Sequence, residues 1–389
     1  MKIKSFSFLT FVLFTFSVFN TGCNSDSLNH NLAPTPPMGW NSWNKFNCGI
    51  SDQLIHQIAD AMVTTGMKDA GYQYVTLDDC WQLPTRENGH LVANPETFPN
   101  GIKPLANYLH SKGLKLGIYS CRGRFTCEKK AGSYDYENTD AQDFAAWGVD
   151  YVKYDNCNPA LFSSQQEDYK RMRECLNNCG RPIVFSICAW GFQDWMPSIG
   201  DLWRTTGDIT DKWQRMVELV DTNEQYISYS SPSHWNDPDM LEIGNGGMTD
   251  VEYRSQFNLW SIMAAPLIAG NDLRAMSPAT LETLTNKEVI AVDQDPLGQQ
   301  GGRVESSGKD LLIYAKSLSN PHQKAVVLFN RTASGCPMSV HWKAIGLAEG
   351  KANVRDLWQH KDLGEFSNEY KVMVLPHGST MLVITGETL

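Results

Sequence analysis

Long hydrophobic runs and low-complexity segments are missing from almost the whole of this 389-residue sequence. Hydrophobic residues make up 42% and charged residues 20%, which is ordinary for a soluble globular chain and argues against disorder or a multi-span membrane protein. Positively charged residues are also relatively few, since the chain has 33 Lys and Arg but 43 Asp and Glu. The net charge of −10 argues against nucleic acid or anionic lipid as a partner and suits a neutral substrate.

Three widespread catalytic motifs are absent as well. The sequence contains no HExxH-type metal-ligand cluster, no glycine-rich phosphate loop and no G-x-S-x-G nucleophile elbow. We therefore expect neither a metal nor a cofactor.

The one long apolar run lies at the N-terminus. Two lysines precede the run from Ser5 to Phe19, which is too short to span a bilayer, so residues 1–22 are predicted to be a signal peptide. The small residues before Cys23 resemble a bacterial lipoprotein signal and predict lipidation of Cys23, with plain secretion as the alternative. Residues 23–33 would be a tether. We expect an exported bacterial protein, periplasmic or held on a membrane by this lipid alone.

Strand-like and helical segments alternate through most of the remaining chain. Eight strand-like segments occur, from MGWNSW at 38–43 to PLIAG at 266–270, with helical spacing of apolar residues between them. This rhythm predicts an α/β fold, a closed (β/α)₈ TIM barrel over residues 34–300. Short alternating runs such as KAVVLFN and TMLVIT then predict an antiparallel β-sandwich domain over residues 301–389.

The segment YVKYDNC at 151–157 places two charged residues in a strand-like run. Side chains alternate along a strand, so Lys153 and Asp155 share one face, which in a barrel looks inward at the mouth where active sites lie. A neighbouring ammonium favours the ionised carboxylate, so Lys153 is expected to hold Asp155 as an anionic nucleophile. The alternative is that the two residues form a structural ion pair.

Other charged and aromatic residues follow the ends of neighbouring strand-like segments. The charged ones are Asp78, Asp79, Arg204, Asp208 and Asp239, and the aromatic ones include Trp43, Tyr119 and Trp190. A turn or helix cap explains any single aspartate, and core packing most tryptophans, but neither explains the repetition at successive strand ends. A sugar has a C–H face for an aromatic ring and hydroxyls for carboxylates. Paired carboxylates without a cofactor therefore predict glycoside hydrolysis.

Seven short motifs also occur in one order between Ala33 and the C-terminus: PPMGWNSW, LDDCW, GIYS, YVKYDNC, WRTTGDI, WNDPDML and QDPLG. In these motifs the chain resembles glycoside hydrolase family 27, the α-galactosidases and α-N-acetylgalactosaminidases. The resemblance implies the same barrel and β-sandwich, a monomer or homodimer, and no cofactor. It also implies a retaining exo-glycosidase that releases terminal α-D-galactosyl residues from oligo- and polysaccharides.

The matching motifs assign individual roles within this resemblance. Asp155 is implied to be the nucleophile and Asp208 the general acid/base. Asp78 and Asp79 would accept hydrogen bonds from the 4- and 6-hydroxyls of galactose, and Trp43 would form a ring wall. The other implied substrate-binding residues are Tyr119, Cys127, Lys153, Cys188, Trp190, Arg204, Asp239 and Met240. The resemblance further pairs Cys48 with Cys80 and Cys127 with Cys157 as disulfides.

One departure from the family pattern concerns specificity. Where α-galactosidases usually have CEW, this chain has CAW, and the small Ala189 favours acceptance of an N-acetyl group on the sugar. Trp190 and Phe192 are expected to crowd that group, so galactose is the first expectation. The alternatives are an α-N-acetylgalactosaminidase, a β-L-arabinopyranosidase, or an inactive sugar-binding relative.

A second departure concerns cysteine. Cys121, in YSCRGRFTC, adds a thiol beside Cys127 and leaves the pairing of Cys127 with Cys157 open. Cys175 and Cys179 are spaced i,i+4 on a predicted helix, and we expect buried thiols or an unusual disulfide rather than a metal site. Cys188 is expected to be a free thiol in the pocket.

Overall fold

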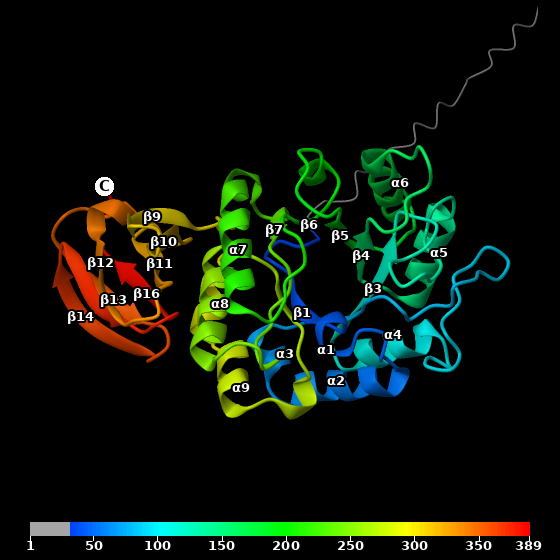
Figure 1. Ribbon diagram of the computed structural model, residues 1–389, viewed down its shortest axis with the longest axis horizontal. Coiled ribbons are helices and arrows are strands. Elements are labelled where there is room, and N and C mark those ends of the chain that lie inside the picture. Colours follow the sequence, from blue (N-terminus) through cyan, green and yellow to red (C-terminus); the bar gives the residue numbers. More distant parts are fainter. Residues whose placement is uncertain (1–31) are drawn as a thin grey trace, which may run out of the picture.

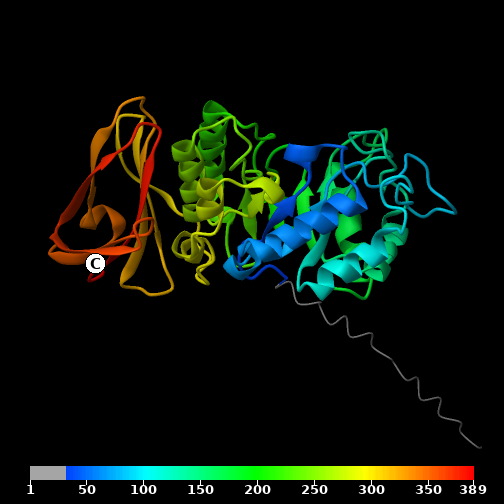
Figure 2. The same cartoon turned by 90° about the horizontal axis from the view of Figure 1, so that it is seen from below.

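The computed structural model describes residues 32–389, so the predicted signal peptide, Cys23 and most of the predicted tether lie outside the described residues. The described part is elongated, with a helix-covered barrel at one end and an all-β domain at the other (Figures 1 and 2). Among residues 32–389, no helix combines the length and the apolar character needed to cross a membrane.

The barrel is built on a parallel sheet with the strand order β7-β6-β5-β4-β3-β2-β1-β8. Its strands are β1 (Met38–Asn41), β2 (Tyr74–Leu77), β3 (Lys115–Cys121), β4 (Tyr151–Asp155), β5 (Val184–Cys188), β6 (Leu202–Arg204), β7 (Trp235–Asp237) and β8 (Leu267–Ala269). The two ends of the sheet meet where Leu241, just after β7, pairs in parallel with Ala269 of β8. The predicted (β/α)₈ architecture is confirmed.

Helices follow the strands around this sheet. They are α1 (Trp43–Phe46), α2 (Asp52–Thr64), α3 (Met67–Ala70), α4 (Ile102–Ser111), α5 (Glu137–Trp147), α6 (Gln165–Asn177), α7 (Trp213–Asn223), α8 (Asp250–Ile262), α9 (Pro278–Leu284) and α10 (Lys287–Asp293). Local sequence explains several of their ends. The side chain of Ser51 caps α2 by accepting from the backbone N–H of Leu54, and Thr249 and Glu252 form a capping box on α8. The expected helical position of Cys179 is wrong, because α6 ends at Asn177.

The alternation along β4 explains why charge gathers at only one end of the barrel. Val152 and Tyr154 point outward and join the core between strands and helices. The first residues of five strands instead close the interior at its N-terminal end as an apolar layer of Tyr74, Tyr151, Val184, Leu202 and Trp235. Lys153 and Asp155 follow Tyr151 on the inward face, toward the C-terminal mouth.

The β-domain has two antiparallel sheets of unequal size. Its strands are β9 (Gly302–Ser307), β10 (Leu311–Ser317), β11 (Gln323–Asn330), β12 (Cys336–His341), β13 (Lys351–Asp356), β14 (Lys361–Ser367), β15 (Glu369–Val374) and β16 (Ser379–Thr385). Six strands form one sheet in the order β14-β13-β16-β11-β10-β9, while β12 and β15 form the other. The predicted antiparallel sandwich is confirmed.

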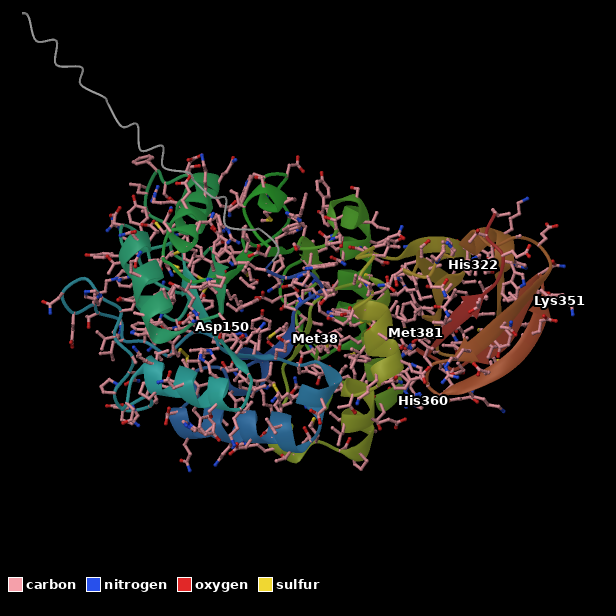
Figure 3. All side chains as sticks on the ribbon, turned by 180° about the vertical axis from the view of Figure 1, so that it is seen from behind. Met38, Asp150, His322, Lys351, His360 and Met381 are labelled. Atoms are coloured by element: carbon pink, nitrogen blue, oxygen red, sulfur yellow. A yellow bond between two sulfur atoms is a disulfide. The ribbon has the colours of Figure 1, made fainter. Side chains whose placement is uncertain are left out.

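Both faces of the larger sheet are apolar, because it lies between two cores. Along β11, Val327 and Phe329 join the core that continues into the barrel, whereas Val326 and Leu328 join the core inside the sandwich. Figure 3 shows Met381 at the junction with the barrel and Lys351 at the outer end of the β-domain. The sheet therefore fastens the β-domain to the barrel.

Polar contacts reinforce this junction on the α8 side (Figure 1). Asn258 of α8 donates to the hydroxyl of Ser379 at 2.8 Å and accepts from the indole of Trp358 at 2.8 Å. Helix α7 contributes as well, since Trp213 stacks on His377 with 4.5 Å between ring centroids.

Candidate active site

A cavity of about 630 Å³ opens at the C-terminal ends of the barrel strands. It is lined by all thirteen residues for which a catalytic or substrate-binding role is expected: Trp43, Asp78, Asp79, Tyr119, Cys127, Lys153, Asp155, Cys188, Trp190, Arg204, Asp208, Asp239 and Met240. These residues follow or belong to seven different strands, so the barrel is what brings them together. No residue of the β-domain lines this cavity.

Asp155 is the last residue of β4 and is only 8% exposed. Its Oδ2 accepts a hydrogen bond from the Tyr119 hydroxyl at 2.9 Å. Its Oδ1 accepts from the Trp190 indole at 2.9 Å and from the backbone N–H of Asn156 at 2.7 Å. Three donors thus hold this carboxylate in one orientation.

Lys153 does not pair with Asp155, so the alternative of a structural ion pair between these two residues is wrong. Its Nζ lies 2.7 Å from Oδ2 of Asp78, on the segment after β2, two strands away in the sheet. Residues i and i+2 of a strand are about 6.6 Å apart along its axis, so Lys153 sits deeper than Asp155 and reaches a different carboxylate. Burial acts to lower the pKa of Lys153, but the charges of Asp78 and of the other acidic groups around it, Asp155 and Asp239 among them, together outweigh burial and raise the pKa above its ordinary value.

Arg204, the last residue of β6, organises the opposite wall. It is buried, and its Nη2 lies 3.0 Å from Oδ2 of Asp239 and 3.1 Å from Oδ1 of Asp208. Within the described residues, its Nε has no hydrogen-bond partner. Asp208 itself is exposed at the rim. Partial burial acts to raise the pKa of Asp208, but the Arg204 charge and hydrogen bond hold it below its ordinary value.

Asp79 is 1% exposed and is held by backbone donors. The N–H groups of Cys80 and Glu128 donate to its two oxygens at 2.7 and 2.9 Å. Burial raises the pKa of Asp79, while these donors act in the opposite direction. These donors hold the Asp79 carboxylate in one orientation.

Both expected disulfides are present. Cys48 joins Cys80, and Cys127 joins Cys157, so the cavity walls at Asp79 and Asp155 are each tied to a second loop. Cys121 does not interfere with the second bond. It is a buried thiol whose Sγ lies 3.1 Å from the carbonyl oxygen of Phe125, and burial raises its pKa.

The remaining cysteines of residues 32–389 are free thiols, including Cys175, Cys179 and, in the cavity wall as expected, Cys188. Two clusters in that range bring three metal-ligand atoms together, Cys48 and Cys80 with Glu128, and Cys127 and Cys157 with Asp155. In both, the cysteines are joined as a disulfide and offer no thiolate to a metal.

The loop after β5 differs from expectation. Phe192 does not line the cavity, because its ring packs against Tyr226 and Tyr229 at 4.4 and 4.5 Å between centroids. Ala189 is 5% exposed, and its carbonyl oxygen accepts from Gln165. Of these three residues only Trp190 lines the cavity, so the Trp190 indole is the one bulky side chain among them that can crowd a bound sugar.

The sequence interpretation missed eight further lining residues. They are Asn44, Lys45, Asn47, Ile209, Thr210, Asp211, Glu242 and Asn245. All of them follow β1, β6 or β7. Each lies close in sequence to Trp43, Asp208 or Met240, and this proximity was the signal that could have predicted them. Glu242 is the most distinctive. It is 4% exposed, and burial together with neighbouring charges raises its pKa to about 7.

An eight-stranded parallel barrel whose mouth gathers buried and exposed carboxylates beside aromatic rings is the architecture of a glycoside hydrolase. The chain matches the family described as "Alpha galactosidase A" over residues 35–295 and the "Alpha galactosidase C-terminal beta sandwich domain" over residues 308–384. It therefore belongs to the α-galactosidase family.

Individual relatives agree with this assignment. The chain is 48% identical to alpha-galactosidase 2 of Arabidopsis thaliana, with 99% of each chain covered. It is 42% identical to alpha-galactosidase A of Cellvibrio japonicus, with 90% of this chain and 92% of the relative covered. The crystal structure of α-galactosidase I from Mortierella vinacea superposes with a TM-score of 0.87 at 37% identity, covering 92% of this chain and 99% of that one.

Proposed function

We propose that the protein is a retaining exo-glycosidase that hydrolyses terminal α-D-galactosyl residues of oligo- and polysaccharides. The observation that carries this proposal is the placement of Asp155 and Asp208 in one cavity, the first buried under three donors and the second exposed at the rim. The apolar layer beneath closes the barrel, so a sugar chain enters by its end. That geometry supports exo-cleavage.

In this mechanism Asp155 attacks the anomeric carbon while Asp208 protonates the leaving glycosidic oxygen. The carbon–oxygen bond breaks, a covalent glycosyl-enzyme forms, and the aglycone leaves. Asp208 then takes a proton from water, which attacks the same carbon and releases Asp155. Two inversions retain the anomeric configuration.

The contact between Arg204 and Asp208 suits the second step, because a carboxylate whose pKa is lowered is ready to act as a base. The first step needs a proton on Asp208. A sugar hydroxyl that draws the Arg204 donors toward itself weakens this contact and favours that proton. The unpaired Nε of Arg204 supports such a hydroxyl contact.

Recognition of galactose is proposed to rest on Asp78 and Asp79. Each carboxylate is fixed by its present partners and keeps lone pairs for further donors. A galactose 4-hydroxyl that donates to this pair satisfies it, whereas the wrong epimer leaves buried groups unpaired. The indole of Trp190 in the cavity favours galactose over its N-acetylated form.

The test is hydrolysis of p-nitrophenyl α-galactoside beside the α-N-acetylgalactosaminide and the β-L-arabinopyranoside, with Asp155→Asn as control. We expect the α-galactoside to be the best substrate and the substitution to abolish its cleavage. A higher rate on another sugar would contradict the galactose assignment. No rate on any of the three would indicate a sugar-binding protein instead.

Export is a separate proposal, supported by the N-terminal sequence alone. We propose that residues 1–22 are removed and that Cys23 becomes a lipidated N-terminus. The relatives reported above come from plants as well as bacteria, so they do not favour a bacterial lipoprotein over plain secretion. The intact mass of the mature protein distinguishes a diacylated Cys23 from an unmodified start. Two other expectations also stay predictions. One is the domain boundary between residues 300 and 301, and the other is that the protein is a monomer or a homodimer.

A further inference from the structure

One histidine of the β-domain contacts the first turns of two barrel helices. His377 lies in the turn between β15 and β16, where its backbone N–H donates to the carbonyl oxygen of Thr332 at 3.1 Å. Its ring stacks on Trp213, the first residue of α7, with 4.5 Å between centroids and 12° between planes. Its Nδ1 lies 2.7 Å from Oε1 of Glu252, in the first turn of α8. This side chain therefore joins both helix starts to the β-domain.

The contact with α8 involves the groups that begin this helix. Glu252 accepts from the backbone N–H of Thr249 at 2.8 Å through Oε2, which completes the capping box, and meets His377 through Oε1. The hydroxyl of Ser255, one turn further along, donates to the carbonyl oxygen of His377 at 2.9 Å. The carboxylate that caps α8 is thus held between its own helix and the β-domain.

The starts of α7 and α8 in turn hold the loop that carries Asp208. This loop joins β6 to α7. Arg215, in the first turn of α7, donates its Nε–H to the carbonyl oxygen of Asp208 at 2.8 Å. The hydroxyl of Tyr253, in the first turn of α8, lies 2.9 and 2.8 Å from the two carboxylate oxygens of Asp211. The two helices that meet at His377 therefore anchor the loop on both sides.

Asp208 depends on this anchoring more than Asp155 does. The side chain of Asp208 is 86% exposed at the rim, whereas Asp155 is buried under three donors. A general acid must come within hydrogen-bond reach of the oxygen that it protonates, and a misplacement of about 1 Å can cost about a hundredfold in rate. With little packing around the carboxylate, the backbone of its loop sets its position.

We propose that His377 is a positioning residue, which holds the starts of α7 and α8 against the β-domain and thereby holds Asp208 where it can protonate the leaving oxygen. This inference rests on the proposed function, because it takes Asp208 as the general acid. The β-domain lines no part of the cavity, so its contribution to catalysis passes through this contact. Loss of the contact impairs protonation of the leaving group more than it impairs attack by the nucleophile.

The test compares methyl α-D-galactoside with 2,4-dinitrophenyl α-D-galactoside. Methoxide leaves only with a proton, whereas dinitrophenolate leaves without one, so only the first substrate needs the acid. In His377→Ala we expect kcat/KM for the methyl galactoside to fall about tenfold more than for the dinitrophenyl galactoside. Both constants scale with the amount of folded enzyme, so partial unfolding does not change their ratio. Asp208→Ala is the reference for complete loss of the acid and should shift the ratio in the same direction.

His360→Ala is the matched control. His360 is also a β-domain histidine with a left-handed backbone, at φ +52 beside φ +51 for His377. Its Nδ1 lies 2.8 Å from Oε1 of Glu288, so it too joins the β-domain to a barrel glutamate (Figure 3). Glu288 belongs to α10, none of whose residues lines the cavity. We expect this control to keep the wild-type ratio, and a shift equal to that of His377→Ala would overturn the proposal.

Equal losses on both substrates in His377→Ala would overturn it too, as would wild-type values on both. Where that variant fails to fold, His377→Phe keeps a ring over Trp213 and removes the bond to Glu252. We then expect a shift of about threefold in the same direction, and an unchanged ratio would overturn the proposal. A wild-type protein that cleaves neither galactoside refutes the proposed function itself. Equal losses in Asp208→Ala refute the role of Asp208, and both outcomes differ from an unchanged ratio in the His377 variants alone.

Discussion

Trp190 donates its indole N–H to Oδ1 of Asp155 at 2.9 Å, although Trp190 is 59% exposed and Asp155 is 8% exposed. The backbone of Trp190 has φ +64, in the left-handed region that costs a residue with a Cβ roughly 1 kcal/mol or more, and Gly191 follows with φ +128. Such strain persists where the surroundings hold the residue in place. We infer from this contact that Trp190 positions Asp155, the proposed nucleophile.

Replacing Trp190 with Phe keeps an aromatic ring and removes the N–H donor. A hydrogen bond to a charged group contributes about 1.5–3 kcal/mol, so we expect kcat on p-nitrophenyl α-galactoside to fall roughly tenfold to a hundredfold. Trp195→Phe is the control, because Trp195 packs on Tyr169 at 5.4 Å between centroids and does not line the cavity. The same loss in both variants would count against a specific role for the Asp155 contact.

Azide separates the roles of the two carboxylates. In Asp208→Ala the rate should fall about a hundredfold or more, and azide should restore it by attacking the glycosyl-enzyme, with α-galactosyl azide as product. In Asp155→Ala azide replaces the nucleophile and should give β-galactosyl azide. NMR of the anomeric proton distinguishes the two products. The same anomer from both variants would show that the roles are assigned wrongly.

The buried ion pair between Lys153 and Asp78 should be costly to break. Lys153→Met leaves Asp78 buried without its counter-charge, and we expect a loss of about 3–5 kcal/mol in the free energy of unfolding. Urea denaturation measures this, and adding Asp78→Asn should recover part of the loss. Lys351→Met is the control, since its ion pair with Glu365 lies on the exposed surface and should matter little. Equal stability of both single variants would contradict this account.

Glu242 should make stability depend on pH near neutrality. Its folded-state pKa of about 7 lies above its ordinary value of 4.5, chiefly because of burial, so the folded state holds a proton that the unfolded chain releases. The contribution is most favourable below pH 4.5 and is lost as pH rises through 7. Relative to Glu242→Gln, the wild type should lose on the order of 2 kcal/mol of stability between pH 5 and pH 8. Parallel stability profiles of the two proteins would rule this out.

The strand pattern was readable without the structure because side-chain alternation is a local property. YVKYD predicted a strand with Lys153 and Asp155 on one face, and β4 spans those residues. The i,i+4 spacing of Cys175 and Cys179 was a weaker signal, since local spacing does not say where a helix stops. Helix α6 ends between them, at Asn177.

Local sequence patterns could not predict the partners of the charged groups. Lys153 pairs with Asp78, which lies 75 positions away in the sequence. Glu242 accepts a hydrogen bond from the side chain of Asn44, which lies 198 positions away. The position of Phe192 was unpredictable for a related reason. Its ring packs against Tyr226 instead of lining the cavity, because packing between distant segments decides where a loop side chain lies.

The sequence by itself determined which residues form strands and helices and which of them face inward, since periods of 2 and 3.6 depend on neighbours along the chain. The tertiary structure alone decided which carboxylate meets which cation, and that residues after β1, β6 and β7 share one wall. Closing the barrel sets those distances, and no local pattern encodes them.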